Sequence, residues 1–491
     1  MRAEPEFGSW GFIMRIVPAL PILSGRAAWK KLDAWAASAG VDEKVAASVR
    51  AIVAAVRAHG DRALRELALR FGDEVPRRFE LSPEEVRKAA DSVPRSARRV
   101  IERAARNIGG FARAVAKAAK PVRLSKGEVR TGLDWRPVDR AGCYVPAGRH
   151  PLPSTALMTA LAARAAGVPE IVIACPRPVP EIVFAGRLAG VERFFRIGGA
   201  QAIAALALGT ESVPKAGVIA GPSNAYVAEA KRQLQGEAGF DLIAGPSEVA
   251  VVADSSARPD RVALDLLAQA EHDPDACAWL LTDCMKLARA VASEIERLAG
   301  ALELPSFVSG TPAGTAGIPP ASRGAGRRLG PSEAEGPELH AGNASGSPVP
   351  NSKLETSNSK PFPSISLLVF KDLAECAEAS NRIAPEHLAL HVRRPKAWKP
   401  RFRHYGAMFL GGESSVAFGD YMAGPNHTLP TGRCARFQGG LTPFAFLRPQ
   451  AWTRMGKGAV RLAEDTGAFA DLEGLTAHAA AARARAGKHR P

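Results

Sequence analysis

The stretch LLAQAEHDP near the middle of the chain brings a carboxamide, two carboxylates and an imidazole to the end of an apolar segment. Apolar residues before it recur at helix spacing and a proline closes it, so the sequence predicts a helix that ends here. On this helix Gln269 and His272 lie one turn apart on one flank, with Asp265 one turn earlier, whereas Glu271 points away. A Gln beside a His can bind a metal ion, and it can equally be a capped and hydrogen-bonded helix end.

Two more clusters combine carboxylates with imidazoles. In RIAPEHLAL, Glu386 and His387 are neighbours where a loop enters a strand, so both can reach one cavity as an acid–base pair. The alternative is an exposed Glu beside a structural His. In GDYMAGPNHTLPTG, Asp420 and His427 lie in a Gly/Pro-rich loop that has little reason to carry them for packing.

Near the C-terminus, LEGLTAHAAAARAR places Glu473 and His478 on a short amphipathic helix, for which an exposed surface helix is the alternative. Together the clusters supply the nitrogen and oxygen donors that zinc and similar divalent ions bind. Their spacing alone does not show that they converge.

The elements around these clusters indicate an α/β fold. Residues 41 to 130 carry apolar residues at helix spacing, with Gly60 and Asp61 separating two helices. From residue 141, short apolar runs alternate with Ala-rich helical segments, which is typical of a parallel sheet with crossover helices. Ligands on such sheets bind at the carboxyl ends of the strands, where two AGPS tetrapeptides fall, at Ala220 and Ala244.

The segment from 305 to 364 differs from the rest, because roughly half of its residues are Gly, Pro or Ser and no apolar periodicity remains. We expect it to be disordered or a surface excursion. After it, ISLLVF is predicted to be a strand, and DLAECAEASNRIAPEHLALHV a helix followed by a strand.

Length and composition indicate a globular protein of several domains. A chain of 491 residues with 46% hydrophobic and 23% charged residues is too long for one core and too apolar to be disordered. Its 65 Lys and Arg exceed its 49 Asp and Glu by 16, but the basic residues are spread along the chain, so we expect no nucleic-acid partner. The six cysteines form no C-x-x-C pair and no apolar run could span a bilayer, so we expect reduced thiols, no membrane partner and a cytoplasmic location.

Eight motifs taken together resemble the histidinol dehydrogenase family, in its order and mostly in its spacing. They are YVPAG, RIGGAQAIAALALGTESVPKAG, AGPSNAYVAEAKRQ, IAGPSEVAVVAD, DLLAQAEHD, NRIAPEHL, GDYMAGPNHTLPTG and LEGLTAHA. The similarity runs from about residue 24 to 485 outside the segment 305–364. It implies an α/β fold with two incomplete Rossmann-like parallel-sheet domains, a helical N-terminal extension and a small C-terminal extension.

The resemblance also implies where these domains begin and end. The implied parts are an N-terminal extension at 1–32, a discontinuous first α/β domain at 33–143 and 247–441 that contains the insert 305–364, a second α/β domain at 144–246, and a C-terminal dimerisation segment at 442–491. Members of the family are homodimers in which this last segment completes the partner's site.

The activity that the resemblance implies is the oxidation of L-histidinol to L-histidine through histidinaldehyde, the final steps of histidine biosynthesis, with NAD and one zinc per subunit. Glu386 and His387 would be the acid–base residues. The implied zinc ligands are Gln269, His272, Asp420 and His478. The implied substrate contacts are these four residues together with His387, Ser247, His427 and Glu473. The implied cofactor contacts are Tyr144, Gln201 and Asn224. No G-x-G-x-x-G follows a predicted strand, so NAD binding rests on the resemblance alone.

Three features depart from the family pattern. Ser223 and Ala147 stand where the family commonly has Gly, and a Cβ at 223 would crowd a turn that prefers positive φ. The segment 305–364 stands in place of a family helix–turn segment, and it is either a long insert or a piece of the gene that is not translated in frame.

Two alternatives stay open beside histidinol oxidation. A related zinc- and NAD-dependent enzyme could oxidise another small alcohol, although Glu473 and His427 suit a cationic, imidazole-bearing substrate. An inactive paralogue that acts as a zinc-bound structural or interaction protein would follow if the insert disrupts the core.

Overall fold

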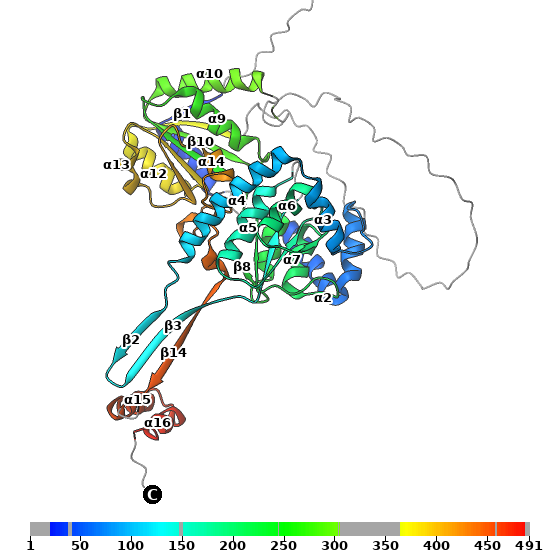
Figure 1. The fold of residues 1–491 in the computed structure, drawn as a ribbon. Helices are drawn as coiled ribbons and strands as arrows, with labels where there is room; N and C mark the ends of the chain where they lie inside the picture. Colours follow the sequence, from blue (N-terminus) through cyan, green and yellow to red (C-terminus); the bar gives the residue numbers. More distant parts are fainter. Residues whose placement is uncertain are drawn as a thin grey trace, which may run out of the picture.

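The computed structural model of the chain describes residues 20–37, 42–146, 151–243, 245–302, 304, 364–456 and 459–486. Within these residues the chain forms two parallel sheets, each covered by helices on both faces, and an antiparallel arm that projects from them (Figure 1). The α/β class predicted from the alternating apolar runs is confirmed. Ala147 and the segment 305–363 lie outside the described residues.

Sheet A is parallel throughout, with the strand order β1-β11-β10-β9-β12-β13. Its strands are β1 (Ile22–Ser24), β9 (Glu248–Ala253), β10 (Cys277–Thr282), β11 (Ile365–Val369), β12 (His387–His391) and β13 (Ala407–Leu410). Helices α9 (Pro259–Ala270) and α10 (Met285–Ala301) pack on one face, and α1 (Arg26–Ala37) and α12 (Leu373–Ile383) on the other. Every residue of β9 is buried, because a parallel strand between two helical layers has no solvent face.

Sheet B is also parallel, with the order β6-β5-β4-β7-β8. Its strands are β4 (Arg140–Tyr144), β5 (Glu170–Ala174), β6 (Arg193–Phe195), β7 (Val218–Ala220) and β8 (Gly239–Phe240). One face packs against α3 (Pro83–Ser92), α4 (Arg95–Ala116), α5 (Pro153–Ala165) and α6 (Pro180–Leu188). The other face packs against α2 (Glu43–Phe71), α7 (Gly199–Leu208) and α8 (Ala225–Gln233).

The arm is an antiparallel sheet with the order β14-β3-β2, formed by β2 (Val122–Lys126), β3 (Val129–Pro137) and β14 (Leu447–Met455). Helices α15 (Val460–Leu472) and α16 (Thr476–Arg483) lie at its far end, away from both parallel sheets (Figure 1). Between β12 and β13 the chain forms α13 (Pro395–Trp398) and the 3-10 turn η1 (Lys399–Arg401). Sheet A is connected to the arm by α14 (Val416–Tyr421) and the 3-10 turns η2 (Cys434–Arg436) and η3 (Pro443–Phe446).

Several expectations about the first part of the chain need correction. The helical run expected over 41–130 ends with α4, and β2 and β3 follow it as strands of the arm. Helices α2 to α4 pack on sheet B instead of the domain that contains sheet A, and β1 is an edge strand of sheet A, not part of an extension. Apolar periodicity shows that one face of a helix is buried, but not which sheet buries it. The expected break at Gly60 is present as a kink inside α2.

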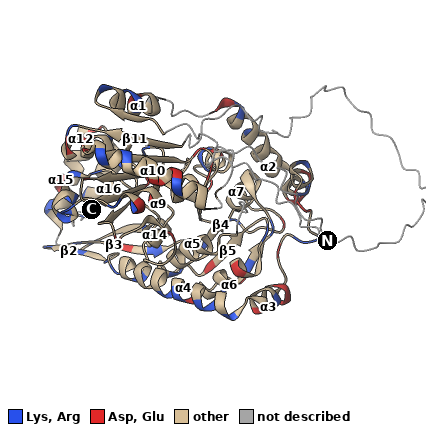
Figure 2. Ribbon diagram, turned by 90° about the horizontal axis from the view of Figure 1, so that it is seen from above, with Lys and Arg blue, Asp and Glu red and all other residues tan. Residues whose placement is uncertain are grey.

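The charged residues are distributed over many elements. Lys and Arg alternate with Asp and Glu on most helices, and the longest row of basic residues follows α4 (Figure 2). Of the helices that the structure describes, none combines the length and the apolar character that crossing a bilayer requires.

The packing of α6 on sheet B gives a test of the fold. A Cβ at Gly186 would lie 2.7 Å from the ring of Phe194 and 2.8 Å from Ile173, both fully buried, so Gly186→Ala should lower the free energy of unfolding by about 1–3 kcal/mol. Gly110→Ala in α4 meets nothing within 4 Å and should instead raise it by about 0.5–1 kcal/mol. Urea denaturation of both variants measures the difference, and a destabilised Gly110→Ala or a neutral Gly186→Ala contradicts this packing.

Candidate active site

Glu386 and His387 stand at the start of β12, beside the first residue of β9. The backbone N–H of Glu248 donates to Glu386 Oε2 over 2.9 Å, and His387 Nδ1–H donates to the carbonyl oxygen of Glu248 over 3.2 Å. Both side chains are buried, with 6% and 5% of their surface exposed. The neighbouring strand therefore holds the predicted acid–base pair on its backbone.

This arrangement decides which nitrogen of His387 can act as a base. Because Nδ1 faces a carbonyl oxygen, which only accepts, the neutral ring carries its proton there and leaves a lone pair on Nε2. Nε2 lies 3.5 Å from Asp420 Oδ1 and is buried without a hydrogen-bond partner among the described residues. When the ring is neutral, Nε2 can therefore take a proton from a bound molecule.

Asp420 and His427 come from α14 and the loop that follows it. His427 Nδ1–H donates to the carbonyl oxygen of Asp420 over 3.0 Å, and its Nε2 lies 3.4 Å from the hydroxyl of Thr155 on α5. The side chain of Asn426 donates to the carbonyl oxygen of Met158, also on α5, over 2.7 Å. The loop that begins at Asn426 therefore connects the sheet A side of the site with a helix of sheet B.

The charged groups of the site shift one another's pKa. Burial raises the pKa of Glu386, and the nearby imidazole of His387 offsets only part of this rise. Burial lowers the pKa of His387, but the carboxylates of Glu386 and Asp420 outweigh it and raise it to about 9. Burial would raise the pKa of Asp420, yet the surrounding imidazoles keep it below its usual value. Asp420 is therefore a charged carboxylate at neutral pH.

The end of α9 approaches the same carboxylates. His272 is exposed just after the helix, and its charge acts on the pKa of Asp420 and of Glu386. Its Nδ1–H donates to the carbonyl oxygen of Ala268 over 2.7 Å, which leaves Nε2 available. Gln269 is buried, and its Nε2 has no hydrogen-bond partner among the described residues.

Other predicted residues lie apart from this group or at its border. Glu473 and His478 are exposed at the far end of the arm, so the same chain does not bring them to Asp420 (Figure 1). Ser247 directly precedes β9, and its carbonyl oxygen accepts from Cys277 N over 2.9 Å. Among the described residues, no three His, Cys, Asp or Glu side chains are grouped as a metal ion requires.

The predicted cofactor residues gather at the carboxyl ends of the sheet B strands. Tyr144 ends β4 and its hydroxyl accepts from Gly199 N over 3.1 Å, at the start of the helix that carries Gln201. Asn224 follows β7 and caps α8 by accepting from Val227 N over 2.9 Å. This is the edge at which parallel sheets bind nucleotides.

The strain expected at Ser223 is absent. Among the described residues other than glycine, positive φ occurs at Ala384 and Arg433 alone. In this turn the residue with positive φ is Gly221, at 149°. A Cβ added to Gly221 would lie only 2.2 Å from the carbonyl oxygen of Tyr144. The backbone approach that requires glycine is therefore made two residues before Ser223.

The two sheets face the site with opposite edges. His387 and Glu248 begin their strands, so sheet A contributes its amino edge, whereas Tyr144 ends its strand and sheet B contributes its carboxyl edge. The predicted acid–base residues therefore lie at the amino edge of sheet A and not at the carboxyl ends of its strands. In this sheet the loops that enter the strands, not those that leave them, carry the reactive side chains.

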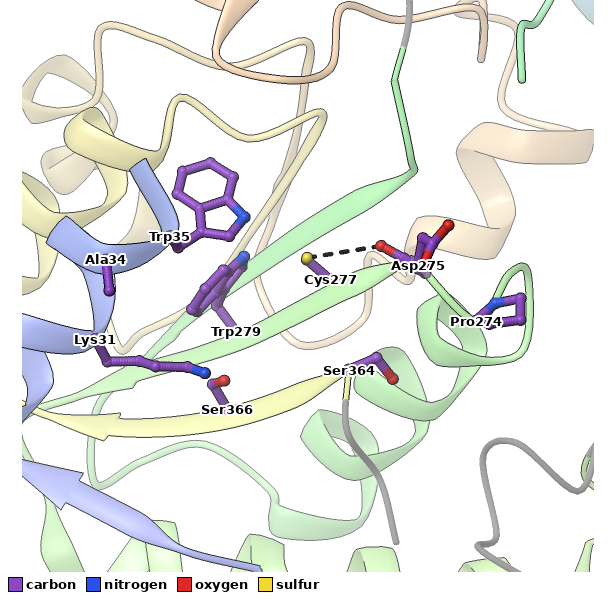
Figure 3. A pocket seen from close by; sticks show the side chains of 10 residues that line it. Lys31, Ala34, Trp35, Pro274, Asp275, Cys277, Trp279, Ser364 and Ser366 are labelled. Atoms are coloured by element: carbon purple, nitrogen blue, oxygen red, sulfur yellow. Dashed lines mark hydrogen bonds between the residues drawn. The ribbon is translucent and has the colours of Figure 1, made fainter. Parts of the chain in front are cut away.

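A cavity of about 680 Å³ contains His387, Asp420 and His427 among its lining residues. A separate cavity of about 370 Å³ lies between α1 and β10, where Trp35 and Trp279 meet edge to face with ring centroids 5.4 Å apart (Figure 3). None of the predicted site residues lines this second cavity. The larger cavity is therefore the candidate active site.

Glu248 is a residue of the site that the sequence analysis did not single out. Its Oε1 accepts from Gly432 N over 3.0 Å, while Oε2 is buried without a partner among the described residues. Burial, together with the charge of Glu386, raises its pKa to about 8. Its place directly after Ser247 in the second AGPS motif was the signal that could have drawn attention to it.

Known proteins of similar sequence decide the family. The family model described as histidinol dehydrogenase matches residues 36–315 and 352–486. A histidinol dehydrogenase from Cereibacter sphaeroides is 40% identical over 449 residues, covering 90% of this chain and 92% of the relative. One from Parasynechococcus marenigrum is 39% identical over 443 residues, covering 89% of this chain and 90% of the relative. The chain belongs to the histidinol dehydrogenase family.

A solved structure agrees with this assignment. The crystal structure of histidinol dehydrogenase from Elizabethkingia anophelis superposes with a TM-score of 0.78 at 27% identity, covering 95% of this chain and 97% of that chain. The resemblance noted in the sequence motifs is thus confirmed. As a member of the histidinol dehydrogenase family, the chain is an oxidoreductase of histidine biosynthesis.

The buried Glu248 predicts a pH dependence of stability. Its pKa is 4.5 in an ordinary setting and about 8 in the folded chain, so between these values the unfolded chain releases a proton that the folded chain keeps. Stability conferred by the protonated carboxyl is complete below pH 4.5, falls as pH rises to about 8, and then stays level. Glu248→Gln retains the acceptor for Gly432 without this titration, so its stability relative to the wild type should rise from pH 5 to pH 8.

Urea denaturation of both proteins between pH 5 and pH 9 measures this difference. Glu85→Gln is the control, because a hydrogen bond from Arg196 lowers the pKa of Glu85 to about 2, well outside this range. Its stability difference from the wild type should be independent of pH from 5 to 9. A Glu248→Gln profile as flat as that control would mean that Glu248 is ionised in the folded chain.

Proposed function

We propose that this chain is a zinc- and NAD-dependent histidinol dehydrogenase that oxidises L-histidinol to L-histidine through histidinaldehyde. The observation that carries the proposal is the convergence of His387, Asp420 and His427 on one cavity, with Glu386 Oε2 lying 3.7 Å from His387 Nδ1. A base with a free nitrogen, a buried carboxyl and a charged carboxylate are the groups that an alcohol oxidation followed by a hydration requires.

The residues at the end of α9 and on α14 fit a zinc site. Asp420 is ionised, His272 has its Nδ1 proton held by a carbonyl oxygen and its Nε2 free, and Gln269 is buried with an unpartnered amide. Such a carbonyl contact is the usual support of a metal-binding histidine. These three residues would hold the ion together with His478. When bound, zinc would polarise the substrate oxygen and offset the charge of Asp420, and NAD would accept the hydride.

The side chains divide the chemistry into two steps. In the first oxidation, Nε2 of the neutral His387 ring removes the alcohol proton, while the other ring proton stays on Nδ1 and is donated to the carbonyl oxygen of Glu248. In the second, Glu386 accepts a proton from the water that attacks the aldehyde, and its raised pKa makes it a stronger base than an exposed carboxylate. Ser247 and His427 contact the substrate, and Tyr144, Gln201 and Asn224 contact NAD at the carboxyl edge of sheet B.

The position of the arm supports a homodimer. Glu473 and His478 lie beyond their own chain's site, so they would complete the site of a second copy (Figure 1). Helix α15 exposes 64% of Phe469 and 85% of Leu472, apolar surface that a partner would cover. The cytoplasmic location expected from the cysteine pattern stays a prediction.

Product stoichiometry tests the reaction. Purified protein with L-histidinol, NAD and zinc should form about two NADH per histidine, since each hydride transfer reduces one NAD. One NADH per substrate would indicate a dehydrogenase of another small alcohol, and no NADH in a zinc-bound protein would indicate an inactive paralogue.

Substitutions at the acid–base pair should separate the two steps. His387→Asn should slow histidinol oxidation by about 10²–10⁴-fold, and Glu386→Gln should slow histidinaldehyde oxidation by a similar factor, because each loses one proton transfer. Steady-state rates with each substrate measure this. Glu43→Gln, at a side chain that is 81% exposed and does not line the cavity, is the control and should leave both rates unchanged. Equal slowing of both substrates by both variants would contradict the assignment.

Subunit mixing tests the shared site. Co-expressed His387→Asn and His478→Asn chains form heterodimers with one intact site, so about a quarter of wild-type activity should return although each variant alone is inactive. A mixture of His387→Asn and Asp420→Asn is the control and should recover nothing, because both changes damage residues that the same chain contributes to the first oxidation. If the first mixture recovers no more than the second, His478 does not act across subunits.

A further inference from the structure

Asp265 on α9 accepts hydrogen bonds from the buried His391 and the half-buried Ser415, both far away in the sequence. His391 Nε2–H donates to Oδ2 over 3.0 Å, and the hydroxyl of Ser415 donates to Oδ1 over 2.8 Å. Asp265 and His391 are 4% and 3% exposed. A buried carboxylate is costly unless both oxygens are bound, and here both are.

The three elements joined by this carboxylate each carry a residue of the site. Gln269 follows Asp265 by one turn on α9, and β12 begins with His387 and ends with His391. Helix α14 begins directly after Ser415 and carries Asp420. The Asp265 side chain thus links the three elements that carry the predicted metal ligands and the predicted base.

Ser415 makes this contact in place of the helix-capping hydrogen bond that is usual for a serine at its position. It stands at the N-cap of α14, where a serine side chain usually accepts from the helix backbone, but within the described chain it makes no such bond. Its hydroxyl goes to Asp265 instead. A second link runs in parallel, because Arg261 on α9 donates to the carbonyl oxygen of Gly412 over 3.0 Å.

We propose that Asp265 is a positioning residue of the metal site: through Ser415 and His391 it fixes the end of α9 against the start of α14, so that Gln269, His272 and Asp420 face one point. Asp265 binds neither metal nor substrate itself. This inference rests on the proposed zinc dependence, and it adds the residue on which the geometry of the ligands depends.

Zinc affinity of the full-length chain, measured by competition with a chromogenic chelator, tests the proposal. Ser415→Ala removes the link to α14 and Asp265→Ala removes both links, so each should weaken zinc binding by about 10–100-fold. Asp265→Asn can still accept from His391 and donate to the Ser415 oxygen, and should restore most of the affinity.

Ser414→Ala is the matched control, because it removes a hydrogen bond of 3.0 Å from the neighbouring hydroxyl to Leu410 O without touching α9. Its zinc affinity should equal that of the wild type. The proposal is overturned if Ser415→Ala and Ser414→Ala bind zinc equally well, or if Asp265→Asn is as weak as Asp265→Ala.

Hydrogen exchange separates this proposal from the zinc assignment. In protein without metal, the amides of α14 should exchange faster in Ser415→Ala than in Ser414→Ala, because the tie to α9 is lost. If the wild type binds no zinc, the proposed function fails, and faster exchange in Ser415→Ala still supports the tie. Equal exchange in the two variants overturns it.

Discussion

The pairing of β9 with β12 is the constraint on which the rest of the site depends. The backbone of Glu248 donates to one side chain of the proposed acid–base pair and accepts from the other, so strand register fixes both Glu386 and His387. A slip of one residue would turn every side chain of β12 to the opposite face. The tautomer of the neutral His387 ring, and with it the choice of Nε2 as base, is thus set by sheet geometry rather than by another side chain.

The site exists because two sheets meet with unlike edges. Sheet B offers the carboxyl ends of its strands and the starts of α7 and α8, the edge at which parallel sheets bind nucleotides. Sheet A offers the entry loops of its strands, which bring carboxylates and imidazoles together. A dinucleotide on one edge and a small polar substrate on the other would then meet between them.

The sequence was sufficient for what depends on local patterns. The flank of α9 that joins Gln269, His272 and Asp265 followed from helix geometry, and the order of α12 and β12 followed from periodicity. The partners of Asp265 did not, because His391 and Ser415 lie 126 and 150 residues further along the chain. No local signal marks such a contact.

Neither the arm nor the role of Glu248 could be predicted from the sequence, and the reasons are related. Strand β3 pairs with β14 across more than half of the chain, and its mixed burial gives no apolar pattern to read. Glu248 reads as the polar start of an apolar strand, and only the folded chain shows that it is enclosed beside Glu386.

The loop from Asn426 to Gly432 has a mechanical consequence. Asn426 is bound to α5 on the sheet B side, whereas Gly432 is bound to Glu248 at the edge of sheet A. Because the loop is anchored at both ends, any change in the angle between the sheets must stretch or turn it. His427 lies within this span and holds the backbone of Asp420, so the loop converts a hinge movement of the whole molecule into a displacement of the groups that face the substrate.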